Sequence, residues 1–420
     1  MLTVLPHTFR ALRSRNYRLF FIGQGMSLTG TWLQQVAMGW LTYKLTGSAW
    51  LLGVVSFCSN AGILFLGTFA GVFADHVNRR RALRVTQSLA LLQAAVLAVL
   101  TWSGHIAVWH LIALALWLGV VTAFEIPLRQ SLWVHLVDDR ADLPNAIALN
   151  SFVVNIARVI GPALAGLLLA VVSEAVCFAL NALSFVAVII AIGKMRWANE
   201  PPPVHWQGSF WKNWAEGYHF VTGYAPARAM LALMAAISWT ISPYSTLMPV
   251  YAKDIYGGGP HTLGFLLAAA GAGALVSTLY LAARATVRGL GRVIAIGATA
   301  CGAALAAFAY LSIFPLALVL MVVIGGSLMM TAAAVNTILQ TIVPDRLRGR
   351  VAGFFSLAFL GMSPLGSLAA GALADAMGVQ ATYLVNGLAA ILASLLFWRV
   401  LPTLRPLMRS TYTKLGIIES

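Results

Sequence analysis

The chain has 420 residues, of which 60% are hydrophobic and only 9% are charged. A soluble domain carries roughly 25% charged residues, so this composition excludes a soluble enzyme of one or two domains. It also excludes intrinsic disorder, because so apolar a chain collapses or enters lipid. The formal net charge of +15 does not indicate nucleic-acid binding, since the basic residues lie between apolar runs and not along one face.

Apolar runs of about 20 residues, the length that crosses the hydrocarbon as a helix, recur along the chain. They predict an all-α membrane protein and not a barrel, whose strands are about ten residues long and alternate in hydrophobicity. The first run follows basic residues but has the length of a span, so we interpret it as a helix and not as a cleaved signal peptide. The twelve predicted transmembrane helices cover residues 17–42, 50–74, 83–102, 107–127, 147–171, 174–194, 227–252, 261–283, 291–311, 315–338, 350–374 and 379–399.

Lysine and arginine residues gather on one side of these predicted helices. Clusters precede the first span and follow the even-numbered spans, whereas the opposite loops hold only Lys44 and Lys253. Basic residues mark the cytoplasmic loops of membrane proteins. Both termini are therefore predicted to be cytoplasmic.

The chain is predicted to consist of two pseudo-symmetric halves. Its longest polar stretch, residues 195–226, contains three consecutive prolines and has the character of a cytoplasmic linker. The linker would separate an N-terminal six-helix bundle, residues 1–194, from a C-terminal six-helix bundle with a cytoplasmic tail, residues 227–420. The halves share residues at an offset of 205 or 206: Gly119, Gly161, Gly166 and Asn181 match Gly325, Gly366, Gly371 and Asn386. One large transporter class has this organisation, with its substrate site near the midplane between the halves.

Several motifs resemble the major facilitator superfamily and its branch of macrolide-efflux, multidrug-efflux and enterobactin-export proteins. The stretch from Gly71 through Asp75 to Arg79-Arg80-Arg81 is similar to the superfamily signature after the second helix, with Asn78 where the family usually has glycine. The motifs that resemble the branch are Asn16-Tyr17-Arg18, Leu45-Thr46-Gly47-Ser48, Asn145-Ala146-Ile147-Ala148-Leu149-Asn150, Ala157-Arg158-Val159-Ile160-Gly161-Pro162 and Arg348-Gly349-Arg350. The resemblance covers essentially the whole chain. It implies the major facilitator fold, a monomer in the bacterial inner membrane, and export of bulky amphipathic drugs or siderophore-like metabolites in exchange for protons.

The signature residues Gly71, Asp75, Arg79, Arg80 and Arg81 are predicted to form a conformational latch. A carboxylate at a cytoplasmic helix end can pair with arginines and cap a neighbouring helix, holding the halves closed on the inner side. The alternative is a solvated loop that only sets orientation. The second half keeps the positive charge at the matching position but has no matching acid, so the latch is predicted in the first half alone.

Ionisable residues inside predicted spans are functional candidates. Glu125 and Arg129 lie four residues apart on one face of the fourth span, and only the first half carries this pair. A glutamate beside an arginine can change protonation when its hydration changes, as proton coupling requires. The alternative is a fixed ion pair that positions the helix end. Arg158 in the fifth span needs a partner, and Glu125 is the obvious candidate.

Amides, hydroxyls and aromatic rings within four spans are candidates for lining a cavity. They suit a bulky, amphipathic and weakly specified substrate, whereas interhelical hydrogen bonds and packing are the alternative for each one. The candidates are Gln24, Thr31 and Gln34 in the first span, Asn155 in the fifth, Trp239 and Tyr244 in the seventh, and Asn336 and Gln340 in the tenth.

The sequence contains no Walker-type phosphate-binding loop, so the energy is predicted to come from an ion gradient or from the substrate gradient itself, and no cofactor is expected. The family resemblance implies the proton gradient as the energy source. Three separated cysteines and scattered histidines predict no metal site. These features predict a secondary transporter that binds a small molecule within the bilayer, and not an enzyme. A lysophospholipid or other lipid transporter of the same superfamily is the alternative. A membrane-embedded transferase and a sensor that lost transport are more distant ones.

Overall fold

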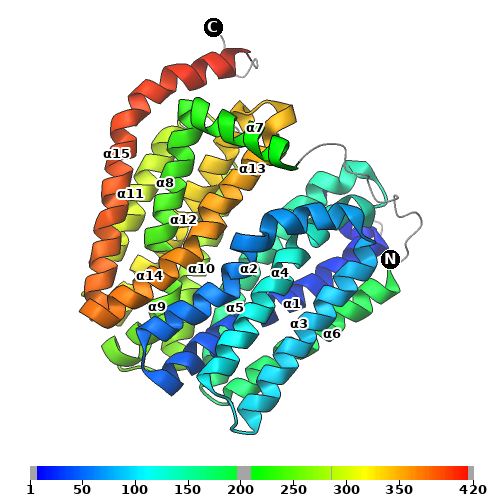
Figure 1. Cartoon of the computed structure of the whole chain (residues 1–420), viewed down its shortest axis with the longest axis vertical. Coiled ribbons are helices and arrows are strands. Elements are labelled where there is room, and N and C mark those ends of the chain that lie inside the picture. The colour runs from blue at the N-terminus through cyan, green and yellow to red at the C-terminus, as the bar shows by residue number, and fades with distance from the viewer. Residues whose placement is uncertain (1–6, 196–209, 285, 415–420) are drawn as a thin grey trace. The chain divides into compact units, whose positions relative to one another are not determined.

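The computed structural model describes residues 7–195, 210–284 and 286–414, and the regular elements in these ranges are helices (Figure 1). Three short 3-10 segments (His7–Arg13, Arg140–Asp142, Asp345–Leu347) and two π-helical turns (Tyr251–Ile255, Leu357–Gly361) accompany the α-helices. The α-helices are α1 (Arg15–Thr46), α2 (Ala49–His76), α3 (Arg79–Trp102), α4 (Val108–Leu136), α5 (Leu143–Leu169), α6 (Glu174–Lys194), α7 (Phe210–Gly223), α8 (Ala225–Ile241), α9 (Tyr244–Val250), α10 (Pro260–Ala282), α11 (Leu290–Phe308), α12 (Phe314–Ile342), α13 (Arg348–Ser356), α14 (Met362–Met377) and α15 (Val379–Lys414).

Within the described ranges, eleven stretches are long and apolar enough to cross a membrane, and they match the second to twelfth predicted spans. The first predicted span is α1, a continuous helix of 32 residues. Its hydropathy is lower because it carries several polar residues, and the side chains of Gln24, Ser27 and Gln34 among them are buried. Polar residues in a span are tolerated on such an inward face. The predicted all-α membrane fold is confirmed.

Two predicted spans are interrupted helices. The seventh consists of α8 and α9, with Pro243 between them. The eleventh consists of α13 and α14 joined by a π-helical turn that ends three residues before Pro364. Proline has no backbone N–H, and its ring clashes with the carbonyl four residues earlier. A break or a π-turn at such a position relieves the clash.

The chain forms two compact units. Unit 1 comprises Met1–His205 and Pro249–Ala268, and unit 2 comprises Trp206–Met248 and Ala269–Ser420. Residues 249–268 follow the predicted linker in the chain, yet their contacts assign them to unit 1. The division of the chain into two six-helix bundles stays a prediction.

The same close helix crossing occurs in both units. In unit 1, a Cβ atom added to Gly62 of α2 would lie 2.1 Å from the carbonyl oxygen of Gly119 in α4. In unit 2, a Cβ atom on Gly325 of α12 would lie 2.0 Å from the carbonyl oxygen of Ala270 in α10. Gly119 and Gly325 are partners in the sequence repeat, so the repeat reflects a shared packing requirement. Small residues allow helix backbones to approach this closely in membranes.

The second half of the predicted linker is a helix. Glu216 of α7 forms an ion pair with Arg350 of α13, and the ring of Trp214 stacks on Tyr218 and packs against Phe354. These contacts dock α7 on α13. The three linker prolines lie outside the described residues.

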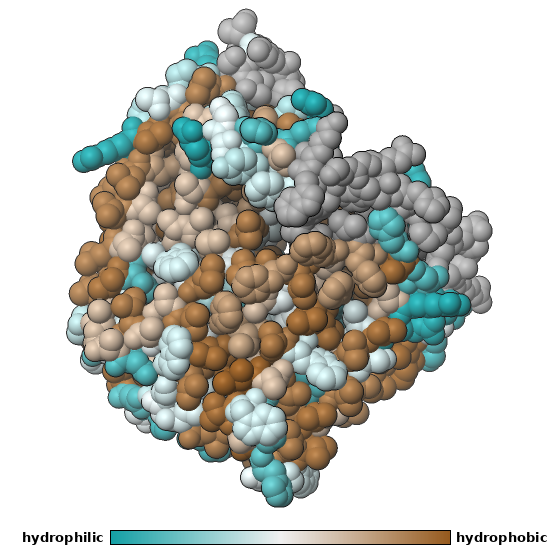
Figure 2. All heavy atoms as spheres, viewed as in Figure 1, coloured by the Kyte–Doolittle hydropathy of each residue, from teal (hydrophilic) through white to brown (hydrophobic). Residues whose placement is uncertain are grey.

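Hydrophobic side chains cover much of the visible surface of each unit, and hydrophilic ones gather toward the helix ends (Figure 2). On α15, Leu388, Leu392 and Leu396 are each more than half exposed and recur every four residues. Water would make such a stripe unfavourable, whereas lipid tails match it. The surface therefore agrees with a protein dissolved in a bilayer.

Candidate transport and coupling site

Glu125 and Arg129 form the predicted ion pair on α4. The Nη1 atom of Arg129 donates a hydrogen bond to Oε1 of Glu125 at 2.9 Å, and the two side chains are only 19% and 13% exposed, respectively. The helical spacing of four residues puts both side chains on one face, with Pro127 between them in the sequence. Removing one partner of so shielded a pair leaves an uncompensated charge, which is far more costly than at an exposed site.

Arg158 of α5 lies over the indole ring of Trp32 in α1. The Cζ atom of its guanidinium is 5.6 Å from the ring centroid, within the range of a cation–π interaction. Trp32 also packs on Gly161, where an added Cβ would lie 2.4 Å from the Cβ of the tryptophan. Arg158 and Gly161, both in one family-like motif, thus meet α1 at the same tryptophan. The expected pairing of Arg158 with Glu125 stays a prediction.

Gln34 lies in a buried amide chain that links four helices of unit 1. Nδ2 of Asn181 in α6 donates to Oε1 of Gln34 at 2.8 Å, and Nε2 of Gln34 donates to Oε1 of Gln93 in α3 at 3.0 Å. Gln93 in turn donates to the carbonyl of Leu114 in α4 at 3.1 Å. Gln34 and Gln93 are 1% exposed and Asn181 is fully buried. In this structure Gln34 holds helices together rather than facing open space.

The Gln34→Leu variant is expected to lower the free energy of unfolding by about 1–2 kcal/mol, because the amides of Asn181 and Gln93 each lose a buried partner. Thermal unfolding of the purified protein in detergent measures this loss. Gln35→Leu is the matched control, since Gln35 is exposed on the same helix and its replacement should leave the unfolding temperature near the wild-type value. Equal unfolding temperatures for both variants would contradict the role of the amide chain.

The other cavity candidates of unit 1 lie on α1 and α5. The side chain of Gln24 is buried. The hydroxyl of Thr31 donates to the carbonyl of Ser27 at 2.9 Å, and Nδ2 of Asn155 donates to the carbonyl of Ser151 at 2.8 Å. Both bonds stay within one helical turn and leave the acceptor oxygens of the side chains available for other partners.

The candidates of unit 2 lie on three elements. Trp239 of α8 is 42% exposed. The carbonyl of Tyr244 in α9 accepts a hydrogen bond from the hydroxyl of Tyr383 in α15 at 2.5 Å. Asn336 and Gln340 are half-buried on α12. These placements are compatible with cavity lining, which stays a prediction.

The latch is only partly described. The side chain of Asp75 lies outside the described residues, while Arg81 is exposed and Arg79 and Arg80 are half-buried at the start of α3. Asn78 caps this helix, because its Oδ1 accepts a hydrogen bond from the backbone N–H of Arg81 at 2.8 Å. Asparagine is a preferred N-cap residue, which explains how the chain tolerates it where the family usually has glycine.

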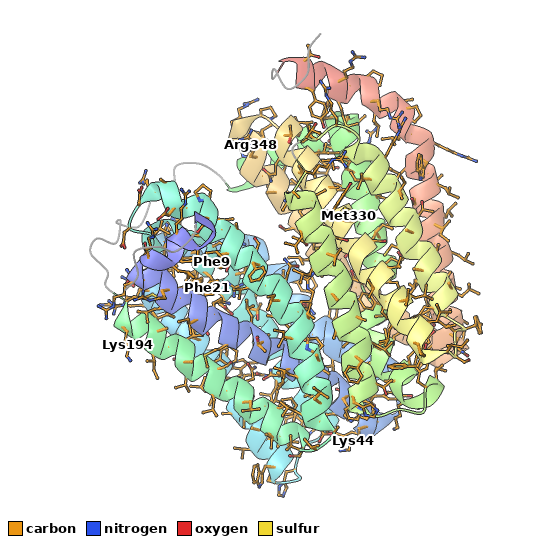
Figure 3. The ribbon with its side chains drawn as sticks, turned by 180° about the vertical axis from the view of Figure 1, so that it is seen from behind. Phe9, Phe21, Lys44, Lys194, Met330 and Arg348 are labelled. Atoms are coloured by element: carbon orange, nitrogen blue, oxygen red, sulfur yellow. The ribbon has the colours of Figure 1, made fainter. Side chains whose placement is uncertain are left out.

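A polar cluster at the C-terminal end of α1 was not predicted from the sequence. Figure 3 labels one of its residues, Lys44. The hydroxyl of Tyr43 donates to Asp254, and the ammonium of Lys253 lies 5.3 Å from the Tyr43 ring centroid. Lys44 forms an ion pair with Glu174 at the start of α6, at 2.9 Å. The only available signal was that Lys44 and Lys253 are the two basic residues of the loops predicted to lie opposite the cytoplasmic side.

The N-terminal segment packs on the start of α5 through family-like motifs. The hydroxyl of Tyr17 donates to the carbonyl of Ala146 at 2.7 Å, and Oδ1 of Asn145 accepts from the N–H of Ala11 at 3.0 Å. The motifs around Tyr17 and Asn145 are thus joined in space across about 130 residues of sequence. They have a structural role at this end of unit 1.

Membrane-length helices, glycine crossings repeated in two units and a shielded ion pair within a span are features of a multi-pass membrane protein. The fold is similar to that of the nucleoside transporter NupG, with a TM-score of 0.71 and 14% sequence identity over 93% of this chain and 99% of that chain. The chain belongs to the transmembrane secretion effector family, whose model matches residues 7–410.

Two curated relatives match most of the chain. The staphyloferrin A transporter of Staphylococcus aureus (strain NCTC 8325 / PS 47) is 28% identical over 91% of this chain and 95% of its own length. The multidrug efflux pump Tap of Mycolicibacterium fortuitum is 29% identical over 86% and 90%, respectively. The superfamily and branch resemblance is confirmed. The protein is a multi-pass membrane transporter and not an enzyme, so the transferase alternative is wrong.

Proposed function

We propose that this transporter exports bulky amphipathic small molecules, either drugs or siderophore-like metabolites, in exchange for protons. The names of two relatives, a staphyloferrin A transporter and a multidrug efflux pump, support this substrate class. Aromatic and amide side chains of α8 and α12, Trp239 and Asn336 among them, would offer an apolar cavity with few polar contacts. The chain would act as a monomer in the bacterial inner membrane with both termini in the cytoplasm.

The Glu125–Arg129 pair is the observation that supports coupling to protons. Protonation of Glu125 removes its negative charge and releases Arg129 from the pair, which changes the preferred packing of the inner end of α4. Binding of a proton and of substrate would then favour different conformations, as exchange requires. The pair occurs in the first half only, so one coupling site per chain is expected.

Alternating access needs contacts that close each side in turn. On the inner side, the latch of Gly71, Asp75 and the following arginines would serve this role.

Proton movement in inverted membrane vesicles tests the proposal. Vesicles containing the protein are energised to acidify their interior, and amphipathic dyes, macrolides or siderophores are added while a pH-sensitive dye reports the gradient. We expect at least one compound class to release protons from these vesicles and not from vesicles that lack the protein. If none of them releases protons, proton-coupled export is wrong, and transport of lysophospholipid becomes the function to measure.

A further inference from the structure

A basic pocket lies at one end of unit 2, where α11 begins and α15 ends. Its cavity volume is about 470 Å³, within the roughly 300–1,000 Å³ of small-molecule sites. Arg288 and Arg292 contribute from the start of α11, and Arg405 and Arg409 contribute from α15. All four side chains are exposed at the rim.

The loop before α11 is held in place by its own side chains. Nη2 of Arg284 donates to the carbonyl of Arg288 at 2.5 Å, and Nε of Arg284 donates to the carbonyl of Thr286 at 3.1 Å. Gly289 then turns the chain into the helix with a φ of 78°, a conformation that favours glycine. Arg288 is thereby fixed beside the N-terminus of α11, whose dipole adds positive potential.

The other wall comes from the last turns of α15. Pro402 and Pro406 lie inside this helix, and the helix bends in this region (Figure 1), as prolines cause helices to do. Arg405 and Arg409 are four residues apart and project from one face. The two pairs of guanidinium groups therefore border the same cavity from two elements.

The floor of the pocket is apolar with one hydroxyl. Ile338, Leu401 and Met408 are buried beneath the arginines. Burial raises the pKa of Tyr412 to about 12, so its hydroxyl stays protonated and can donate a hydrogen bond. An amphipathic ligand with an anionic head would match both the rim and the floor.

The charge of the pocket is not balanced by its own lining. Among the described residues that line it, none is acidic. Four like charges around one cavity repel one another, and a bound anion would relieve this repulsion. Guanidinium groups bind phosphate in a planar, two-pronged geometry that lysine cannot reproduce. The lining thus favours a phosphate group.

We propose that this pocket binds the phosphate group of an anionic membrane lipid. The outer face of α15 exposes Leu392, Leu396 and Val400 just before Arg405, so the arginines follow directly on a surface suited to acyl chains. Basic pockets between helix ends on the cytoplasmic side suit lipid headgroups, and the cytoplasmic leaflet attracts such residues. A soluble phosphate would use the arginines but not the adjoining apolar surface.

Lipid binding to the purified full-length protein tests the proposal. Delipidated protein in detergent is titrated with phosphatidylglycerol, phosphatidylcholine or inorganic phosphate, and bound lipid is counted by native mass spectrometry. The pocket variant Arg292→Gln/Arg405→Gln is compared with Arg346→Gln/Arg399→Gln, which removes the same charge from two exposed arginines of unit 2 outside the pocket. Thermal unfolding verifies that both variants are folded.

We expect the wild type to prefer phosphatidylglycerol over phosphatidylcholine, and the pocket variant to bind phosphatidylglycerol at least tenfold more weakly while the control variant keeps its affinity. The single variant Arg288→Gln, in an exposed loop, should weaken lipid binding by about fivefold. It replaces the double variant in the comparison if the double variant does not fold. Equal losses in both double variants would overturn the proposal. Displacement of the lipid by an equal concentration of inorganic phosphate would also overturn it, because the ligand would then be a soluble anion.

Discussion

The Gly62→Val variant is expected to yield little folded protein. Even the first added carbon would lie 2.1 Å from the carbonyl oxygen of Gly119 and 2.6 Å from the backbone nitrogen of Val120. Backbone atoms cannot turn aside as a flexible side chain does, so α2 and α4 must separate along their crossing. Overpacking a tight core costs about 1–3 kcal/mol, and a clash with backbone on a facing helix should reach the upper end of that range or exceed it.

Fluorescence-detected size exclusion and thermal unfolding in detergent measure this loss. The matched control is Gly67→Val, in the same helix, where an added Cβ meets nothing within 4 Å. Both variants lose the same backbone freedom of a glycine. The difference between their unfolding temperatures therefore measures the cost of the clash at the helix crossing. We expect little monodisperse protein for Gly62→Val and near wild-type behaviour for Gly67→Val. Unchanged yield and unfolding temperature for Gly62→Val would show that the two helices do not cross this closely.

The second large effect is expected from Glu125→Gln, which should uncouple transport from the proton gradient. Glutamine has nearly the same shape as glutamate but takes up no proton at physiological pH. We therefore expect the substrate to reach about equal concentrations on the two sides of the membrane, because its movement no longer draws on the proton gradient. Exchange of labelled for unlabelled substrate needs no proton and should persist.

Two further variants separate coupling from stability. Asp142→Asn removes a carboxylate that also has an arginine partner in unit 1, Arg10, at 3.0 Å, and it should keep coupled transport. Glu125→Gln/Arg129→Gln removes both charges, which is less destabilising than leaving one of them buried, and it should be folded and uncoupled. Coupled transport by a folded Glu125→Gln protein would reduce the ion pair to a structural role.

Features set by the local sequence were predictable. Span positions follow from apolar runs, and the i, i+4 spacing placed Glu125 and Arg129 on one face before their contact was seen. The matched Gly119 and Gly325 revealed a repeat, although the sequence could not say that each meets the backbone of a neighbouring helix. The i, i+4 spacing depends on the helix period alone.

Features set by tertiary contacts were not predictable. The helix α7 is stabilised by docking on α13 through Glu216 and Arg350, partners that are 134 residues apart. Tyr43 and Asp254 are 211 residues apart, so no spacing rule connects them. A single helix shows which residues share a face but not what that face touches, and for this reason Gln34 was expected at a cavity although it joins the amide chain.

Purified protein in proteoliposomes tests most directly whether proton movement drives export. A pH gradient of either sign is imposed, and the accumulation of a fluorescent amphipathic substrate is followed in vesicles with and without the protein. Accumulation is expected only on the more acidic side of the membrane, because protons leaving that compartment drive substrate into it. It should be lost when nigericin collapses the gradient. Equal substrate movement with the gradient intact, reversed or collapsed would contradict proton-driven export.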